Sequence, residues 1–216
     1  GIPFRRRCVS LRGHGRAAFF EGGHGLVAVR PRLVPLFEGG VPRREGRFPV
    51  RFRRHNMTIK VGDKIPTGAL HLKTADGVEE MSTDALFGGK KVVVFALPGA
   101  FTPTCSAKHL PGFVAKADEI AAKGVDTIAC VSVNDAFVMD AWGVDQNVGQ
   151  KVMMLADGSA NFTKALGLEL DLTGRGMGMR SQRYAMIVED GTVTGLMVEA
   201  AGAFDVSSAE NILANL

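Results

Sequence analysis

The seven residues 91–97 (KVVVFAL) constrain the fold of this chain more than any other segment. Valine and phenylalanine favour an extended strand, and six apolar side chains in succession place apolar groups on both faces of that strand. A strand of this kind is stable only when helices or other layers cover both faces of its sheet. The segment therefore predicts an α/β protein in which 91–97 is a central, buried strand.

The segments that follow the central strand predict a parallel crossover. Residues 106–123 have the polar positions of a helix with one exposed face, and Gly124 is a typical helix end. Residues 125–133 (VDTIACVSV) are a second strongly apolar run of strand length. A strand, a helix and a second strand in this order predict two parallel strands joined by the helix.

The rest of the apolar pattern predicts hairpins and shorter helices. Asp190-Gly191 separates two alternating segments, 183–189 and 192–199, and this dipeptide is typical of a tight hairpin. A second hairpin is predicted at 69–82. Further helices are predicted at 136–144, 160–166 and 207–216. A parallel crossover followed by an antiparallel hairpin predicts a thioredoxin-like fold, with a central mixed β-sheet flanked by helices.

Residues 1–56 differ sharply from the rest of the chain in charge. They hold thirteen arginines, no lysine and three glutamates, a net charge of +10, whereas residues 57–216 hold thirteen basic and nineteen acidic residues, a net charge of −6. The first segment is rich in Gly, Pro and Arg and has no helical or strand period, so we expect a disordered or non-native leader before a folded domain at 57–216. The basic pI of about 9.1 for the whole chain results from the arginines of this leader. It therefore does not point to nucleic-acid binding by the domain.

Several origins of the leader are compatible with its composition. An organellar transit segment is Arg-rich and acid-poor, as here, but also Ser-rich, and only Ser10 is present. The absence of lysine before Met57, and the start-like Met57-Thr58-Ile59-Lys60, favour upstream sequence that is not part of the natural protein. We expect a cytoplasmic protein, or a mitochondrial matrix protein if the leader is a transit segment. The longest apolar runs are of strand length, so no membrane span is predicted.

The stretch 98–105 (PGAFTPTC) carries the strongest chemical signal, because it links the central strand to the long helix. Cys105 falls in the first turn of that helix, where the helix dipole favours a thiolate. Thr102 lies three residues earlier, close enough for its hydroxyl to donate to the sulfur, and Gly99 allows close approach of the backbone. The segment predicts a narrow pocket around one nucleophilic sulfur, with a small buried core cysteine as the alternative.

Other cysteine chemistry fits the sequence less well. A dithiol motif would need a cysteine three residues after Cys105, where Lys108 stands, and the cysteines lack the spacing of a zinc site. His109 is expected to be a packing or surface residue rather than a base. Cys130 is either a core residue or a resolving thiol for Cys105, and both interpretations stay open at this stage.

Only three arginines occur in the predicted domain: Arg175, Arg180 and Arg183. A guanidinium beside the sulfur would favour the thiolate and stabilise charge on a leaving oxygen. Arg175 and Arg180 are expected in a loop rich in Gly and Met. Arg183 stands at the start of a predicted strand, but the sequence alone does not place it near Cys105. A surface salt bridge is the alternative for all three.

The stretch 98–113 (PGAFTPTCSAKHLPGF) resembles the active-site signature of the peroxiredoxins, in particular the type II or peroxiredoxin-5-like subfamily. The similarity continues through 123–143, 155–172 and 180–193 and covers roughly 58–216. It implies a thiol-dependent peroxidase that reduces hydrogen peroxide and alkyl hydroperoxides through a cysteine sulfenic acid, without a metal or other cofactor. In the residues that match, it implies a peroxidatic Cys105, a peroxide-orienting Thr102, an Arg183 that completes the site, a shielding Pro98 and a pocket-lining Gly99.

The resemblance leaves the regeneration step open. Animal-type members have a resolving cysteine near the C-terminus, where this chain has Ser207 or Ser208. Cys130 matches the second cysteine of plant and bacterial members, but two sulfurs at strand ends would be far apart without local unfolding. We therefore expect one-cysteine behaviour, with glutaredoxin/glutathione or thioredoxin as the reductant.

The resemblance also implies a homodimer, for which Phe101, Phe137 and Trp142 could supply an apolar contact. Simple core packing of these aromatic residues is the alternative. Two other functions are compatible with the same cysteine. A peroxide sensor or redox relay would pass a disulfide from Cys105 to a client protein, and a structural or chaperone-like thioredoxin-fold protein would not need the thiol.

Overall fold

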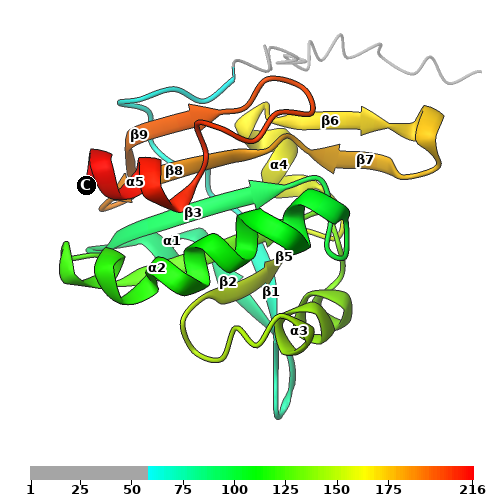
Figure 1. Cartoon of the computed structure of the whole chain (residues 1–216), viewed down its shortest axis with the longest axis horizontal. Helices are drawn as coiled ribbons and strands as arrows, with labels where there is room; N and C mark the ends of the chain where they lie inside the picture. Colours follow the sequence, from blue (N-terminus) through cyan, green and yellow to red (C-terminus); the bar gives the residue numbers. More distant parts are fainter. Residues whose placement is uncertain (1–57) are drawn as a thin grey trace, which may run out of the picture. The chain divides into compact units, whose positions relative to one another are not determined.

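The predicted central strand, β3 (Lys91–Leu97), lies inside a seven-stranded mixed sheet with the order β2-β1-β5-β4-β3-β8-β9 (Figure 1). The computed structural model describes residues 58–216. β3 pairs in parallel with β4 (Thr127–Ser132) and antiparallel with β8 (Tyr184–Glu189), so it has a partner on each side. The predicted α/β, thioredoxin-like architecture with a mixed sheet is therefore confirmed.

The hairpin predicted around Asp190-Gly191 joins β8 to β9 (Thr192–Val198). Asp190 and Gly191 have φ values of 45° and 69°, the two left-handed positions that a two-residue hairpin turn requires. The other predicted hairpin is formed by β1 (Ala69–Thr74) and β2 (Gly77–Ser82). These two hairpins occupy the opposite edges of the sheet.

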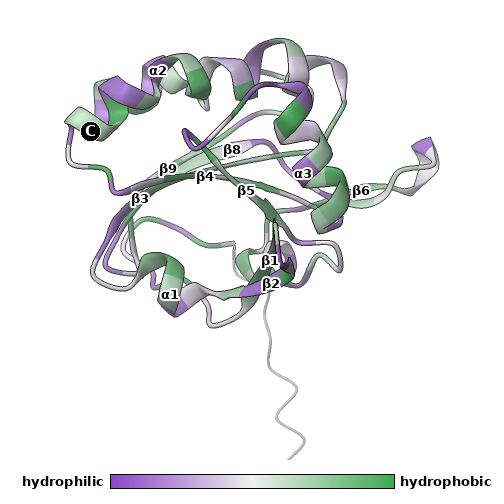
Figure 2. Ribbon diagram, turned by 90° about the horizontal axis from the view of Figure 1, so that it is seen from below, coloured by the Kyte–Doolittle hydropathy of each residue, from purple (hydrophilic) through white to green (hydrophobic). Residues whose placement is uncertain are grey.

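Side chains of the central strands alternate between two apolar cores, one on each face of the sheet. In β3, Val93 and Phe95 enter one core, and Val92 and Val94 enter the other. Helices cover both faces, as Figure 2 shows for α2 and α3 on one side and α1 on the other. The first core is covered by α2 (Leu110–Ala122), α3 (Ala136–Asp145) and α5 (Ala209–Asn215), and the second by α1 (Thr83–Phe87) and α4 (Asn161–Leu166).

Several short elements were not predicted from the sequence. Besides α1, they are β5 (Met153–Ala156), β6 (Glu169–Leu172) and β7 (Gly178–Ser181). Four residues are too few for a clear hydrophobic period, and β7 lies in a glycine- and methionine-rich stretch. β6 and β7 form a separate two-stranded sheet, joined through a short helical turn, Thr173–Arg175. The expectation that Arg180 lies in a loop is therefore wrong, because it belongs to β7.

The helix expected at 106–123 begins differently from the prediction. Its first turn, Cys105–His109, is a wide π-helical turn in which the Leu110 N–H donates to the Cys105 carbonyl, and α2 follows. Pro111 has no N–H, and its ring would press on the carbonyl four residues earlier in a regular helix, so a wider turn suits this sequence. The turn brings Cys105 and His109 to the same buried side, and each is 1% exposed.

The predictions for the leader at 1–56 concern residues outside the described part of the chain. Within residues 58–216, no helix has the length and apolar character needed to cross a membrane.

Candidate active site

The sulfur of Cys105 lies at the end of β3, held in the helix start by a loop that carries Thr102. Thr102 Oγ1 is 2.8 Å from Cys105 Sγ and 2.8 Å from the carbonyl oxygen of Gly99. With a thiol, the hydroxyl donates to the carbonyl and accepts from S–H; with a thiolate, the hydroxyl donates to the sulfur. The Thr102 hydroxyl can therefore satisfy both protonation states without moving.

Arg183, directly before the neighbouring strand β8, reaches the same sulfur. Tyr184, the first residue of β8, pairs with Ala96 of β3, so Arg183 lies at the carboxyl end of β3. Its Nη2 donates to Cys105 Sγ at 3.4 Å. The antiparallel register of β3 and β8 brings these residues together across 78 positions of sequence.

His109 supports the guanidinium from the other side. Its Nδ1 lies 3.0 Å from Arg183 Nη1, and its Nε2 lies 3.0 Å from the carbonyl oxygen of Ser207. Because arginine can only donate, Nδ1 must accept, so the proton is on Nε2 and is donated to Ser207. Burial, and then the positive charge of Arg183, lower the pKa of His109 to about 3. His109 is thus a neutral packing residue, and it also orients Arg183, which the sequence analysis missed.

Asn134 and Arg180 fix the loop that carries Thr102. Asn134 Oδ1 accepts from the Ala100 N–H at 3.0 Å, and Arg180 Nη1 lies 3.4 Å from the same oxygen. A Cβ on Gly99 would stand 3.1 Å from Arg180 Nη1 and 3.3 Å from Thr102 Cγ2, so any larger residue would make these two side chains shift by a few tenths of an ångström. The sequence analysis did not single out Asn134, because its role depends on the neighbouring strand β4.

The sulfur is almost completely shielded from solvent, since Cys105 is 1% exposed. Burial alone would fit an ordinary core cysteine. The two hydrogen bonds from Thr102 and Arg183, both of which are only half-buried, distinguish this sulfur from a core thiol. Pro98, directly after β3, is also half-buried.

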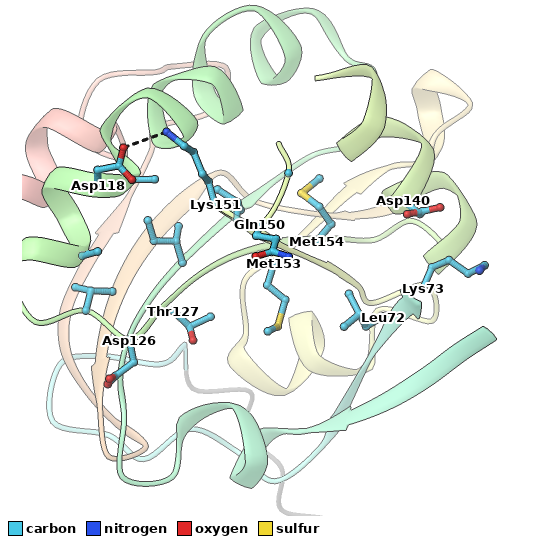
Figure 3. A pocket seen from close by; sticks show the side chains of 16 residues that line it. Leu72, Lys73, Asp118, Asp126, Thr127, Asp140, Gln150, Lys151, Met153 and Met154 are labelled. Atoms are coloured by element: carbon cyan, nitrogen blue, oxygen red, sulfur yellow. Dashed lines mark hydrogen bonds and ion pairs between the residues drawn. The ribbon is translucent and has the colours of Figure 1, made fainter. Parts of the chain in front are cut away.

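A surface hollow of the described residues lies elsewhere. It has a volume of about 610 Å³ and is lined by α2, β4 and β5, with the Lys151–Asp118 ion pair at 3.2 Å on its rim (Figure 3). Cys105, Thr102 and Arg183 do not line it. The candidate site is therefore marked by the hydrogen bonds to the sulfur and not by this hollow. Among residues 58–216, no group of three or more His, Cys, Asp or Glu could hold a metal ion.

Cys130 lies inside β4, opposite Phe95 of β3, and it is fully buried. The assumption that its sulfur stands at a strand end is therefore wrong. Burial, and the nearby Cys105 sulfur, raise the pKa of the Cys130 thiol well above its usual value. Cys130 is in this fold a neutral thiol within the core.

The expected aromatic contact surface is only partly present. Phe101 and Phe137 are 54% and 64% exposed, but Trp142 is fully buried. The Trp142 indole N–H donates to the half-buried Ser106 hydroxyl at 3.0 Å. Trp142 is therefore a core residue, and the interpretation of it as a direct dimer contact is wrong.

Comparison with known proteins places this chain in a family. A family model described as Redoxin matches residues 60–213. Peroxiredoxin-2B of Arabidopsis thaliana is 51% identical over 156 residues, which cover 72% of this chain and 96% of that protein. The chain belongs to the peroxiredoxin family. Peroxiredoxins are thiol peroxidases, so the chain is an oxidoreductase.

Two further similarities support the same assignment. Peroxiredoxin-2E, chloroplastic, of Arabidopsis thaliana is 52% identical over 160 residues, which cover 72% of this chain and 68% of that protein. The crystal structure of reduced Prx3 from Vibrio vulnificus in complex with H2O2 has a TM-score of 0.71 and 57% identity, and the match covers 73% of this chain and 99% of that one.

Substitution of Thr102 by valine in this peroxiredoxin is expected to reduce kcat/KM for hydrogen peroxide by about tenfold or more, since the hydrogen bond from its hydroxyl to the Cys105 sulfur is lost. Thr102→Ser keeps the hydroxyl and is expected to retain most of the activity. Steady-state peroxide consumption measures both variants. Equal activity of the valine and serine variants would show that the hydroxyl is not needed.

Proposed function

We propose that this chain reduces hydrogen peroxide and alkyl hydroperoxides through a sulfenic acid on Cys105. The observation that supports this most is the pair of hydrogen bonds to one sulfur, from Thr102 Oγ1 at 2.8 Å and Arg183 Nη2 at 3.4 Å. Both donors favour the anionic sulfur, which is the reactive nucleophile.

The reaction is a displacement on a peroxide oxygen. The thiolate attacks one oxygen, an S–O bond forms, and the O–O bond breaks. Cys105 is oxidised to sulfenic acid, and the other oxygen leaves with the electron pair and takes up a proton to become water or an alcohol. Negative charge thus moves from the sulfur to the leaving oxygen, and Arg183 can stabilise it at both places.

The other site residues have supporting roles in this proposal. Thr102 donates to the sulfur and orients the peroxide. Pro98 shields the sulfur from water. Gly99 has no side chain, so Thr102 can lie close to the Gly99 backbone. The reaction needs no metal or prosthetic group.

An external thiol is proposed to regenerate Cys105. It condenses with the sulfenic acid to give water and a mixed disulfide, which a second thiol then reduces. Glutaredoxin with glutathione, or thioredoxin, would supply these thiols. Cys130 is poorly suited to this step in the folded protein, because it is a fully buried neutral thiol in mid-strand.

Cys130→Ser is expected to keep most of the peroxidase activity, within about threefold of the wild type, because its thiol is not needed for an external reductant. Turnover of hydrogen peroxide and of an alkyl hydroperoxide should be measured with each reductant system, with Cys130→Ala as a second variant. A folded Cys130→Ser protein that stops after one turnover would instead assign the resolving step to Cys130.

A homodimer is proposed from the two exposed aromatic side chains, Phe101 and Phe137, which lie outside the core. Sedimentation of the wild type and of Phe101→Ser at several concentrations tests this proposal. A monomer at all concentrations would contradict it.

The cellular location is proposed to be the cytoplasm, with an organelle as the alternative. Peroxiredoxin-2E is named as chloroplastic, so a plastid joins the mitochondrial matrix among the organelles to test. Fluorescent fusions of the full chain and of residues 57–216 distinguish these locations. The same diffuse distribution of both fusions supports the cytoplasm, whereas organellar uptake of the full chain alone supports a transit segment at 1–56.

A further inference from the structure

Glu199, directly after β9, has a buried carboxylate that the proposed peroxide chemistry does not use. It is 8% exposed, and its Oε1 accepts three hydrogen bonds. The donors are the N–H of Asp205 at 2.7 Å and the N–H and hydroxyl of Ser207, each at 2.8 Å. One carboxylate oxygen thus closes the loop between β9 and α5.

These hydrogen bonds compensate the cost of burying the carboxylate. Burial alone would raise the pKa of Glu199, but the hydrogen bonds from Ser207 and Asp205 outweigh it and lower the pKa below its usual value. Because Oε1 accepts all three, the closed loop depends on the position of one acceptor oxygen.

The closed loop is connected to the reactive sulfur through a chain of hydrogen bonds. The Ser207 N–H and hydroxyl are held by Glu199, and the Ser207 carbonyl accepts from His109 Nε2 at 3.0 Å. That contact keeps the proton on Nε2 and leaves Nδ1 free to accept from Arg183. Arg183 in turn donates to Cys105.

Two more contacts tie the same loop to Arg183. The Glu199 N–H donates to the Arg183 carbonyl at 2.9 Å, which fixes the backbone at the start of β8. Phe204, inside the closed loop, lies 5.1 Å from the His109 ring and 5.8 Å from the Arg183 guanidinium. The loop therefore contacts Arg183 at its backbone and at its guanidinium.

We propose that Glu199 is a positioning residue, which holds the Arg183 guanidinium on the Cys105 sulfur through Ser207 and His109. Glu199 does not touch the sulfur, and its effect lies in the place of its acceptor oxygen rather than in its charge. The proposal rests on the peroxidase function proposed above.

Two variants separate the position of the oxygen from the charge. Glu199→Gln removes the charge but keeps an acceptor oxygen at the same reach, whereas Glu199→Asp keeps the charge but draws the acceptor back by one methylene. We expect Glu199→Gln to stay within about twofold of wild-type kcat/KM for hydrogen peroxide and Glu199→Asp to lose about tenfold. Glu210→Gln and Glu210→Asp, at an exposed position of α5, are the matched controls.

Two readouts do not require turnover. Isotope-edited NMR of the His109 ring should show the Nε2–H tautomer in the wild type and Glu199→Gln, and a share of the Nδ1–H tautomer in Glu199→Asp. The rate of alkylation of Cys105 by iodoacetamide, which depends on the reactivity and the accessibility of the sulfur, should change in Glu199→Asp only.

Three results would overturn the proposal: wild-type behaviour of Glu199→Asp in all assays, loss of activity in Glu199→Gln with retention in Glu199→Asp, or an unchanged His109 tautomer in Glu199→Asp. A wild-type chain that does not consume peroxide with any thiol would contradict the proposed function instead. In that case the tautomer measurement still tests the hydrogen-bond chain.

Discussion

Replacement of Cys105 by serine is expected to reduce peroxide turnover to the background rate of the reductant alone, a loss of at least about a thousandfold. A serine hydroxyl is not ionised near neutral pH, so the nucleophile disappears although Thr102 and Arg183 stay in place. The side chain is also nearly isosteric, so the buried turn should keep its fold. Steady-state assays with hydrogen peroxide and an alkyl hydroperoxide measure the loss.

Cys130→Ser is the matched control for this experiment, because it makes the same chemical change at a fully buried position. A second test uses no reductant: one equivalent of peroxide should leave a sulfenic acid that dimedone traps at Cys105. Full turnover by folded Cys105→Ser, or trapping at Cys130 instead, would contradict the mechanism.

Acidification is expected to reduce the free energy of unfolding by about 2 kcal/mol between about pH 8 and about pH 5 through His109 alone. The pKa of His109 is about 3 in the folded protein, against a usual value of 6.5. Below 6.5 the unfolded chain binds a proton that the folded chain does not bind until about pH 3. The stabilisation that the neutral His109 side chain provides is therefore complete above pH 6.5 and is lost progressively as the pH falls from 6.5 towards 3.

Denaturant unfolding followed by circular dichroism at both pH values measures this effect. His109→Gln cannot titrate and should lose most of the pH dependence, whereas His71→Gln, at an exposed position of β1, should keep it. Glu199 acts in the same direction, because its lowered pKa gives stability that is lost as the pH falls below its usual value of 4.5. That loss lies below the measured window. An equal slope in the wild type and His109→Gln would contradict the assignment.

The parts of the fold and site that sequence could predict are those set by local chemistry. β3 stands out because apolar residues on both faces require a central position, and Thr102 and Cys105 share one turn. Short elements such as β5 and β7 have no such period. Their position follows from the strands with which they pair.

The parts that sequence could not predict depend on contacts between distant segments. Among the three arginines, only the resemblance singled out Arg183, because its place at the sulfur depends on the register of β3 with β8. The roles of His109 and Glu199 depend on the return of the chain after β9, which no local spacing reveals. Burial of Trp142, which could have been either surface or core, was decided by α3 packing on the sheet.

The position of Trp142 gives this protein an intrinsic optical reporter. Trp142 is the single tryptophan of the chain, and its indole N–H is bonded to Ser106, the neighbour of Cys105 in the same turn. Indole emission depends on hydrogen bonding and on the polarity around the ring. Any step that rearranges this turn is therefore expected to change the fluorescence of the unlabelled protein, and stopped-flow can follow that change after peroxide is added.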